Sequence, residues 1–363
     1  PCVPLRLMFC NFCGTVQLSG TVDPMFLFSN YFWVTGTSKT ALEHSRDFAD
    51  LALRHCMIDN PHVIEIASND GTFLRSFQEK NCKVLGIDPA ENLARLASDS
   101  GIPTIPAFFD LDFAKDFVSE KPPGDLVVAR NVIPHVKEIH SVIEGISTIL
   151  APDGVGIIEF HDTKLILDEL QYDYIYHEHL YYFTLHSIEH LLKKHGLHIY
   201  DLTHSPISGG SHVIFFSKTP KTKTKEALLA FEQEKVSGVN DLDGWVSFRE
   251  RVLRHREKLL GILSGINRKI LAYGASARSS TILNFCKIDN RKVSAIIDKN
   301  SLKHGLITPG SNIPIISYEG GASLAKEHEL VLLLAWNFQN EVISDLRRDH
   351  YEGKFLVPLT GDP

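Results

Sequence analysis

The chain has 363 residues, of which 44% are hydrophobic and 22% charged. That length and apolar content suffice for two buried cores, so we expect two domains. The formal net charge of -7 argues against binding to nucleic acid, because contact with a phosphate backbone needs a basic surface. No apolar run approaches the roughly 20 residues that span a bilayer, and no signal segment opens the chain. We therefore expect a soluble, cytoplasmic protein with no membrane partner.

The first segment carries the only C-x-x-C pair of the sequence, Cys10 and Cys13, which is half of the ligand set of a zinc ribbon. A structural zinc site takes four ligands, so a second pair is needed to close it. Either that pair preceded these residues in a longer chain, or the segment binds no metal, and the sequence leaves both open. The aromatic stretch 31–33 that follows is typical of an arm rather than a core. Together these residues make up a segment over 1–45.

A doubly wound parallel sheet is predicted for the next part of the chain, 46–220, because buried strands alternate there with helices. Helices are expected at 72–78 and 139–150, with turns at 68–71 and 152–154. The segments predicted as strands are 63–66, 83–87, 125–129, 155–159, 198–200 and 212–216. The last two would close the sheet with a hairpin-like edge.

Residues 221–268 mix charged side chains with spaced apolar ones, which predicts one or two long amphipathic helices linking two domains. A second, smaller α/β domain is predicted over 269–363. Its helix is expected at 281–286, and its strands at 269–273, 293–297 and 330–334.

A strand, a turn and a helix followed by a second strand that ends in an acid is an arrangement that binds an adenosyl cofactor at the carboxyl edge of a sheet. Gly71 allows close backbone approach, and Asp88 is placed to accept hydrogen bonds from ribose hydroxyls. No G-x-G-x-x-G is present, which disfavours an NAD-dependent sugar oxidoreductase and suits S-adenosylmethionine, a cofactor without pyrophosphate. An ordinary strand-turn-helix capped by Asp70 is the alternative. The predicted cofactor contacts here are Ala67, Ser68, Asn69, Asp70, Gly71 and Asp88.

The densest cluster of titratable groups spans 174–179 and contains Tyr174, Tyr176, His177, Glu178 and His179. Two imidazoles, a carboxylate and two phenols can supply a general base near neutral pH, an acid that orients it and a hydrogen-bond donor for a developing enolate. A helical zinc site is disfavoured, because such a site needs two histidines four residues apart and His177 and His179 are only two apart. A satisfied polar turn is the other alternative. His135 follows the strand 125–129 and would reach the same edge of the sheet.

The second domain has a small-residue turn at a helix start, where free backbone N–H groups suit phosphate oxygens. Arg278 would add positive charge. A nucleotide diphosphate is a plausible occupant, and a turn of small residues for close helix packing is the alternative. The residues predicted to bind it are Tyr273, Ala275, Arg278, Ser279, Asp298 and Lys303.

Taken together, these motifs resemble the deoxysugar C-methyltransferase family. That family pairs an N-terminal zinc-binding segment with a class I methyltransferase domain and a C-terminal Rossmann-like domain. The resemblance covers nearly the whole chain, and several motifs in one order are more specific than any of them singly. The segments that carry it are 4–7 with Cys10 and Cys13, and 66–72, 86–90, 176–179, 206–211, 272–275 and 334–337.

The resemblance implies a base that removes the proton beside the ketone of a nucleoside-diphosphate keto-deoxysugar, after which the enolate carbon attacks the cofactor's methyl group. On the matching positions His179 is the base and Glu178 orients it. Tyr176, Tyr31 and His135 would contact the sugar. The resemblance further implies cofactor contacts at Pro89 and Asn131, a substrate contact at Ser211, and zinc ligation by Cys10 and Cys13.

Several positions depart from the family pattern, and these changes concern the substrate more than the chemistry. Asparagine is expected at Arg130, lysine and glycine at Arg278 and Ser279, histidine at Ser208, and a leucine-arginine pair at His212 and Val213. A pseudoenzyme that binds the cofactor or a sugar nucleotide without turnover is therefore an alternative. The intact residues of the cluster at 176–179 argue against it.

Overall fold

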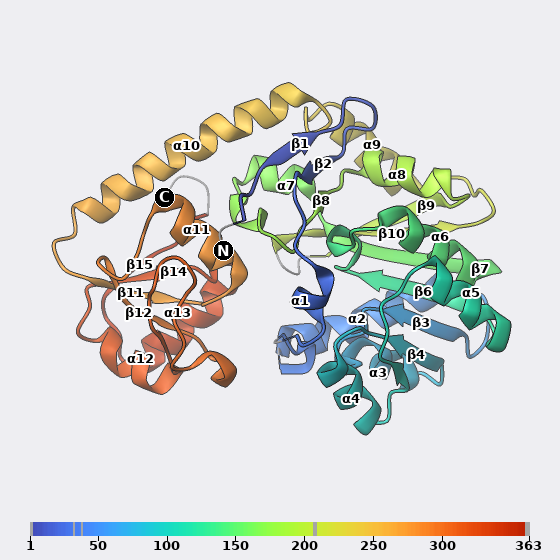
Figure 1. Ribbon diagram of the computed structural model, residues 1–363, viewed down its shortest axis with the longest axis horizontal. Helices are drawn as coiled ribbons and strands as arrows, with labels where there is room; N and C mark the ends of the chain where they lie inside the picture. The colour runs from blue at the N-terminus through green and yellow to red at the C-terminus, as the bar shows by residue number, and fades with distance from the viewer. Residues whose placement is uncertain (1–2, 32, 38, 206–208, 360–363) are drawn as a thin grey trace. The chain divides into compact units, whose positions relative to one another are not determined.

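The computed structural model describes residues 3–31, 33–37, 39–205 and 209–359 (Figure 1). Ser208 and the rest of the motif segment 206–208 lie outside the described residues. The chain forms two compact units. The first unit comprises Pro1–Thr163 and His177–Asn240, and the second comprises Lys164–Tyr176 and Asp241–Pro363. The stretch predicted to hold one or two linking helices contains two, of which α9 (Lys225–Lys235) belongs to the first unit and α10 (Leu242–Ser264) to the second.

A seven-stranded sheet forms the centre of the first unit, in the order β5-β4-β3-β6-β7-β10-β9. Neighbours from β5 to β7 are parallel, whereas β10 runs antiparallel to both β7 and β9. The predicted doubly wound sheet with a hairpin-like edge is thus confirmed. The strands are β3 (His62–Ile66), β4 (Lys83–Ile87), β5 (Thr104–Ile105), β6 (Gly124–Arg130), β7 (Leu150–His161), β9 (His198–Ser205) and β10 (Ser211–Ser217).

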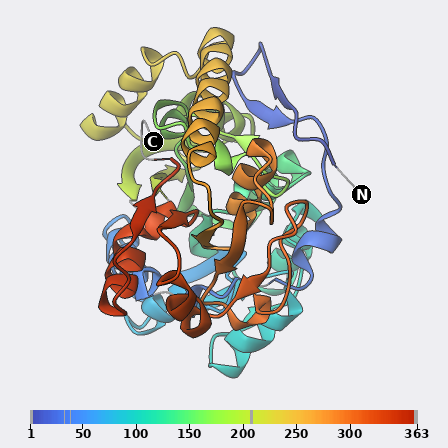
Figure 2. The ribbon, with the colours of Figure 1, turned by 90° about the vertical axis from the view of Figure 1, so that its left-hand side faces the viewer.

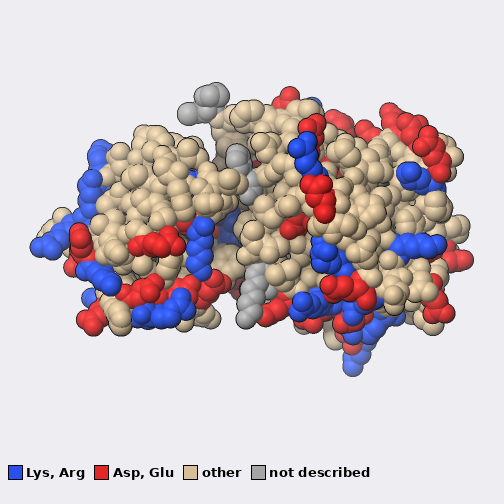
Figure 3. Space-filling model, turned by 90° about the horizontal axis from the view of Figure 1, so that it is seen from below, with Lys and Arg blue, Asp and Glu red and all other residues tan. Residues whose placement is uncertain are grey.

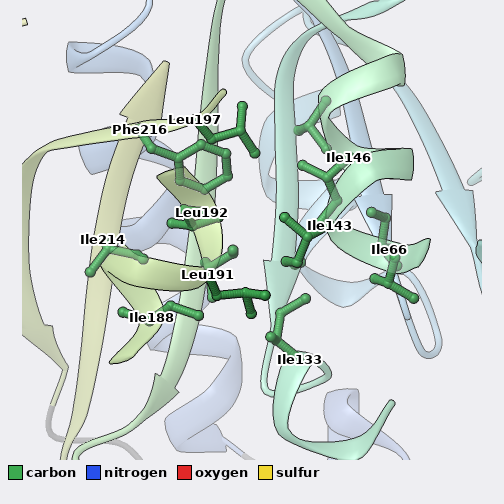
Figure 4. Close-up of a cluster of buried hydrophobic side chains, with 14 of the residues drawn as sticks. Ile66, Ile133, Ile143, Ile146, Ile188, Leu191, Leu192, Leu197, Ile214 and Phe216 are labelled. Atoms are coloured by element: carbon green, nitrogen blue, oxygen red, sulfur yellow. The ribbon is translucent and has the colours of Figure 1, made fainter. Parts of the chain in front are cut away.

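Helices cover both faces of this sheet, because alternate strand residues are apolar on each side. On β10, Val213 and Phe215 pack with α2 (Lys39–Arg54) and α3 (Thr72–Gln78). Ile214 and Phe216 pack on the opposite face with α6 (Ile139–Ile149) and α8 (Leu185–Lys194) (Figure 4). The helices α4 (Glu91–Asp99) and α5 (Leu111–Glu120) complete the two layers.

Two strands extend well beyond their predictions: β9 continues to Ser205 rather than ending at 200, and β7 begins at Leu150 and includes the expected turn at 152–154. Pairing with β6 passes from Gly124 and Leu150 directly to Leu126 and Val155, so the extra residues form an irregularity in the strand. Pro152 has no N–H to donate to a ladder, which accounts for its place in this irregularity.

The N-terminal residues add a three-stranded sheet of β1 (Leu7–Phe9), β2 (Val16–Leu18) and β8 (Tyr181–Tyr182). The following arm contains a short helix, α1 (Pro24–Phe28), which begins after Asp23, whose side chain accepts a hydrogen bond from Met25 N. A single 3₁₀ turn, η1 (Thr35–Thr37), precedes α2.

The second unit is built on a five-stranded parallel sheet, which confirms the prediction of a smaller α/β fold. Its strands are β13 (Ile315–Ile316), β12 (Val293–Ile297), β11 (Ile270–Tyr273), β14 (Leu330–Leu333) and β15 (Lys354–Leu356). Its helices include α12 (Tyr318–Ala325), α13 (Gln339–Arg348) and the continuous α10, plain in Figure 2. Short helical turns are η3 (Tyr172–Tyr174), η5 (Ser301–Lys303) and η6 (Trp336–Phe338), and α7 (Thr163–Asp168) begins at the last residue before the unit boundary.

The helix α11 (Ala277–Cys286) starts four residues before its predicted position. Ser276 caps it by accepting from Ser279 N, and the Ser279 side chain accepts from Ser276 N in return. This reciprocal pair satisfies donors that the first helical turn would otherwise leave unpaired.

On the face drawn in Figure 3, Lys and Arg side chains lie among Asp and Glu side chains, and much of the surface between them is uncharged. Within the described ranges, no helix combines the length and apolar character that crossing a bilayer would require.

Candidate active site

The predicted cofactor turn at the carboxyl end of β3 is held by Asp88, which follows β4. One oxygen of the Asp88 carboxylate, Oδ2, accepts from Asn69 N at 2.7 Å, and Oδ1 accepts from Ala90 N at 2.9 Å. Burial raises the pKa of Asp88 to about 6, although both backbone donors act to lower it. Ala67 and Asn69 adopt φ angles of 55° and 54°, a left-handed conformation that is costly for residues with a side chain. The turn is therefore a specific, strained feature rather than a generic loop.

Two buried acceptors at this turn have no hydrogen-bond partner among the described residues, namely Glu65 Oε2 and Ser68 Oγ. Buried polar atoms are normally paired, so such atoms indicate a ligand or water. The amino group and the ribose hydroxyls of S-adenosylmethionine are donors, which fits these acceptors and the Asp88 carboxylate. Pro89 lies between Asp88 and Ala90 at the end of β4.

Arg130, one of the departures from the family pattern, lies beneath this turn in a buried charge network. Its Nε is 2.9 Å from Glu159 Oε2, its Nη1 is 3.6 Å from Glu65 Oε1, and its guanidinium lies 3.0 Å from the centre of the Phe73 ring. Burial raises the pKa of Glu65 to about 8. Burial would also raise the pKa of Glu159, but Arg130 and His44 together lower it to about 2. Arg130 thus pairs with an ionised Glu159, whereas Glu65, with its pKa at about 8, mostly keeps its proton at pH 7.

The arm is anchored to the turn by side chains that the sequence assigned to the cofactor. Asn69 Oδ1 accepts from Thr35 N at 3.0 Å, and its Nδ2 donates to Trp33 O at 3.0 Å. Asp70 Oδ2 accepts from Gly36 N at 2.9 Å. Their predicted contact with the cofactor stays a prediction, and the structure gives both residues a role in positioning the arm.

Tyr31 links the arm to the H-E-H motif. Asn92 on α4 holds its backbone, because the amide accepts from Tyr31 N at 3.2 Å and donates to Tyr31 O at 2.9 Å. The Tyr31 hydroxyl donates to Glu178 Oε2 at 3.1 Å. Burial, followed by the charge of Glu178, raises the pKa of Tyr31, and Asp88 also contributes. Tyr31 therefore lies within electrostatic reach of both Glu178 and Asp88, the carboxylate that holds the cofactor turn and is called the cofactor clasp below.

His135 and His179 meet edge to face, with ring centres 4.9 Å apart. His135 belongs to η2 (Ile133–His135), which follows β6, and Pro134 O accepts from Leu180 N at 2.8 Å to hold the two segments together. Burial lowers the pKa of His135 to about 4, so its imidazole is neutral at pH 7. The predicted meeting of His135 with the H-E-H motif is present.

The remaining residues of that motif are placed differently. His177 Nε2 lies 2.8 Å from Val3 O. Burial raises the pKa of Glu178. Tyr176 is the last residue of the second unit's short segment, so its predicted contact with the sugar stays a prediction.

Asn131 and Ser211 both lie at the ends of sheet strands in the first unit. Asn131 follows β6 with a φ of 50°, and its N–H donates to Glu159 O at 2.7 Å. Ser211 opens β10, where its hydroxyl is buried with no partner among the described residues. Both can accept a ligand contact, and neither is assigned one by the structure.

The second unit has an acid clasp of its own, meaning a carboxylate after a strand that accepts two backbone N–H groups, as Asp88 does in the first unit. Asp298 follows β12, and its carboxylate accepts from Ala275 N at 2.8 Å and from Asn300 N at 2.8 Å. Lys303 Nζ donates to Ala275 O at 2.9 Å and to the same carboxylate at 3.3 Å. Tyr273 ends β11 with its hydroxyl buried and unpartnered within the described ranges. The predicted set Tyr273, Ala275, Asp298 and Lys303 is thus brought together.

The Arg278 side chain is buried within the second unit, against residues of its short segment 164–176. Its Nε donates to Asp173 Oδ2 at 2.8 Å, and the guanidinium lies over the rings of Tyr174 and Trp336 at 4.0 and 4.7 Å. Burial would lower the pKa of Arg278, but the Asp173 carboxylate and its neighbours raise it. Ser279 is fully buried in the cap of α11. Their predicted contacts with a diphosphate stay predictions.

Cys10 and Cys13 lie in the turn between β1 and β2, closed by a hydrogen bond from Gly14 N to Cys10 O at 2.9 Å. Hydrogen bonds from the backbone around Cys13 and Phe12 lower the pKa of Cys10, which favours the thiolate that metals bind. No third ligand residue joins the two cysteines in the described part of the chain, so they offer half of a tetrahedral zinc shell.

Two positioning residues were missed from the sequence: Asn92 and Gly36. Asn92 has no signal beyond its place four residues after Asp88. Gly36 stands between two threonines, and a Cβ there would meet Asp70 Oδ2 at 2.6 Å. That close approach explains the glycine, but it is visible only in three dimensions.

The sheet order with one reversed strand and an acid clasp beside the central strand defines a class I S-adenosylmethionine-dependent methyltransferase. Comparison with known proteins agrees. Residues 42–202 match a methyltransferase domain, and residues 206–360 match the C-methyltransferase C-terminal domain. The C-methyltransferase NovU of Streptomyces niveus is 32% identical over 364 residues, covering 98% of this chain and 86% of NovU. The chain belongs to the C-methyltransferase family.

Solved structures similar to this chain cover about half of it. Magnesium protoporphyrin IX methyltransferase of Synechocystis PCC 6803, with bound S-adenosylmethionine, is 12% identical over 49% of this chain and 79% of its own, with a TM-score of 0.38. A TehB-like methyltransferase of Corynebacterium glutamicum is 16% identical over 48% of this chain and 88% of its own, with a TM-score of 0.37.

Proposed function

We propose that this protein C-methylates a nucleoside-diphosphate keto-deoxysugar at the carbon beside its ketone. The observation that carries the proposal is Tyr31, which is held beside the cofactor clasp by Asn92 and donates its hydroxyl to Glu178. A proton-handling cluster therefore accompanies the methyl-donor site. The NovU relationship supports C-methylation as the reaction, and the keto-deoxysugar is what the resemblance of the sequence motifs implies.

In the proposed reaction, His179 takes the proton from the carbon beside the ketone, and the C–H electron pair forms an enolate. That carbon then bonds to the methyl group while the methyl–sulfur bond breaks, which leaves S-adenosylhomocysteine and a protonated His179. S-adenosylmethionine supplies the electrophilic methyl group when it is bound. Alignment of the carbon, methyl and sulfur atoms should account for much of the rate.

The neighbours of His179 have distinct proposed roles. His135 is neutral at pH 7, so its N–H can donate to the developing enolate oxygen without a prior proton transfer. Glu178, fixed by Tyr31, favours protonated His179 through its negative charge. In the second unit, the turn at Ala275 and the Lys303 side chain are proposed to bind the nucleoside diphosphate.

Proton abstraction and methyl transfer can be tested separately. The wild type, incubated in D₂O with a thymidine-diphosphate 4-keto-6-deoxysugar and S-adenosylhomocysteine, is expected to exchange the proton beside the ketone for deuterium. With S-adenosylmethionine it should form a product heavier by one CH₂ group. His179→Asn should lose both reactions while calorimetry shows unchanged affinity for S-adenosylmethionine.

The conservative control is His177→Asn, because His177 Nε2 lies against the carbonyl of Val3 and has no role in the proposed reaction. It should keep both reactions. Full exchange by His179→Asn would refute its assignment as the base. Tight cofactor binding with neither reaction in the wild type, across keto-sugar nucleotides, would favour a pseudoenzyme.

A further inference from the structure

Three side chains that the reaction does not use come together at one edge of the first unit's sheet. Asp162 directly follows β7, His204 lies near the end of β9, and His212 is the second residue of β10. His204 and His212 are direct partners in the antiparallel ladder, so they project from the same face of the sheet. One ligand atom from each of the three residues lies within 4.8 Å of the other two.

The spacing suits a small metal ion. His212 Nε2 is 3.3 Å from Asp162 Oδ1. Zinc bonds of about 2.0–2.1 Å in tetrahedral geometry separate neighbouring ligand atoms by about 3.3–3.4 Å. The His204 and His212 rings are 4.9 Å apart, and a change of the exposed His204 rotamer can close the remaining gap. The backbone is fixed, since Asp162 N donates to Gly210 O at 3.2 Å.

The charge of the cluster also suits a cation. Asp162 supplies a carboxylate, and imidazole binds metals in its neutral form. His212 is 4% exposed, so its imidazole is shielded from bulk water. A buried carboxylate with two imidazoles is a donor set typical of zinc.

We propose that Asp162, His204 and His212 bind one zinc-class divalent ion, with a fourth position left for water or a ligand oxygen. The ion would join the ends of β7, β9 and β10. This site is separate in composition from the half-site at Cys10 and Cys13, and the proposed methyl transfer contains no metal-dependent step. Failure of one proposal would therefore leave the other standing.

The experiment uses the full chain with Cys10→Ser and Cys13→Ser, which removes the competing thiols. After metal removal and dialysis against buffered Zn²⁺, we expect one bound zinc per chain by elemental analysis. Co²⁺ should give visible d–d bands without the near-ultraviolet thiolate band that a cysteine site produces. Zinc should also raise the melting temperature, because it binds the folded chain.

In that background, His204→Gln should weaken zinc binding by more than about 100-fold, since even outer partners of a metal ligand are worth 10–100-fold. Asp162→Asn should do the same with minimal change of shape. The matched control is His198→Gln, at the other end of β9, which should keep wild-type affinity. Unchanged zinc affinity in both ligand variants, or no zinc bound by the folded parent, would overturn the proposal and leave a simple His–Asp pair.

Discussion

Replacing Gly36 with alanine should release the arm from the cofactor turn. A Cβ at this position would lie 2.6 Å from Asp70 Oδ2 and 2.8 Å from Thr72 Oγ1, closer than real side chains approach. Asp70 cannot turn away without loss, because its Oδ1 accepts from the Thr72 hydroxyl at 2.8 Å. The substitution therefore breaks the 2.9 Å hydrogen bond from Gly36 N to Asp70.

The size of the effect follows from that bond. A hydrogen bond to a charged group contributes about 1.5–3 kcal/mol, which shifts the equilibrium between anchored and released arm by roughly 10- to 150-fold. Tyr31 keeps its own two bonds to Asn92, so kcat/KM should fall by at most this factor. Chymotrypsin, which cleaves after aromatic residues, should cut the segment 31–33 faster by a comparable factor.

The control is Gly20→Ala, in the preceding segment, where an added Cβ meets nothing within 4 Å. It should leave both the cleavage rate and kcat/KM unchanged. Wild-type cleavage and activity in Gly36→Ala would refute the idea that this contact anchors the arm. Equal effects of the two substitutions would show that general flexibility, rather than the Asp70 contact, is responsible.

Three further predictions concern the buried charges. Asp88→Asn should weaken S-adenosylmethionine binding in calorimetry by about 1–3 kcal/mol at pH 8. As the pH falls through about 6, Asp88 takes up a proton, so the affinity of the wild type should approach that of the variant. Arg130→Met should lower the free energy of unfolding in urea by about 3–5 kcal/mol at pH 7, with a smaller loss below pH 4.5 as the stabilisation from ionised Glu159 fades. His135 has a folded pKa of about 4, below the ordinary 6.5, so unfolded chains bind its proton first and the wild type loses stability between pH 6.5 and 4. His135→Gln should flatten that part of the urea profile, and an unchanged slope would contradict the assignment.

The sheet of the first unit was predictable because its strands are buried on both faces. Such strands appear in the sequence as short, nearly continuous apolar runs, and β3 and β4 were located to within a residue. Helix α2 was missed, since its apolar face of Phe48, Ala49 and Ala52 is broken by charged residues and follows an irregular arm. Local patterns do not reveal which face a helix will bury against a distant sheet.

The site was predictable where one turn or one motif carries it, as with Asp88 and His179. Contacts between distant segments were not, because they depend on the folded arrangement. The Arg130 departure was visible in the sequence, but its partners Glu65 and Glu159 lie on separate strands. Likewise, the link from Tyr31 to Glu178 spans 147 positions of the chain.

The two units share one backbone design, and their acid clasps differ in one feature, the Lys303 ammonium group that contacts Asp298 in the second unit. Asp88 accepts two backbone N–H groups, and burial leaves its pKa raised to about 6, so a ligand's hydroxyl donors would relieve an under-solvated carboxylate. Asp298 accepts the corresponding pair, but Lys303 also donates to it. Because the ammonium already satisfies that carboxylate, the second clasp gains little from ribose hydroxyls. A diphosphate that draws Lys303 away suits it better, which favours the adenosyl cofactor in the first unit and a phosphate-bearing ligand in the second.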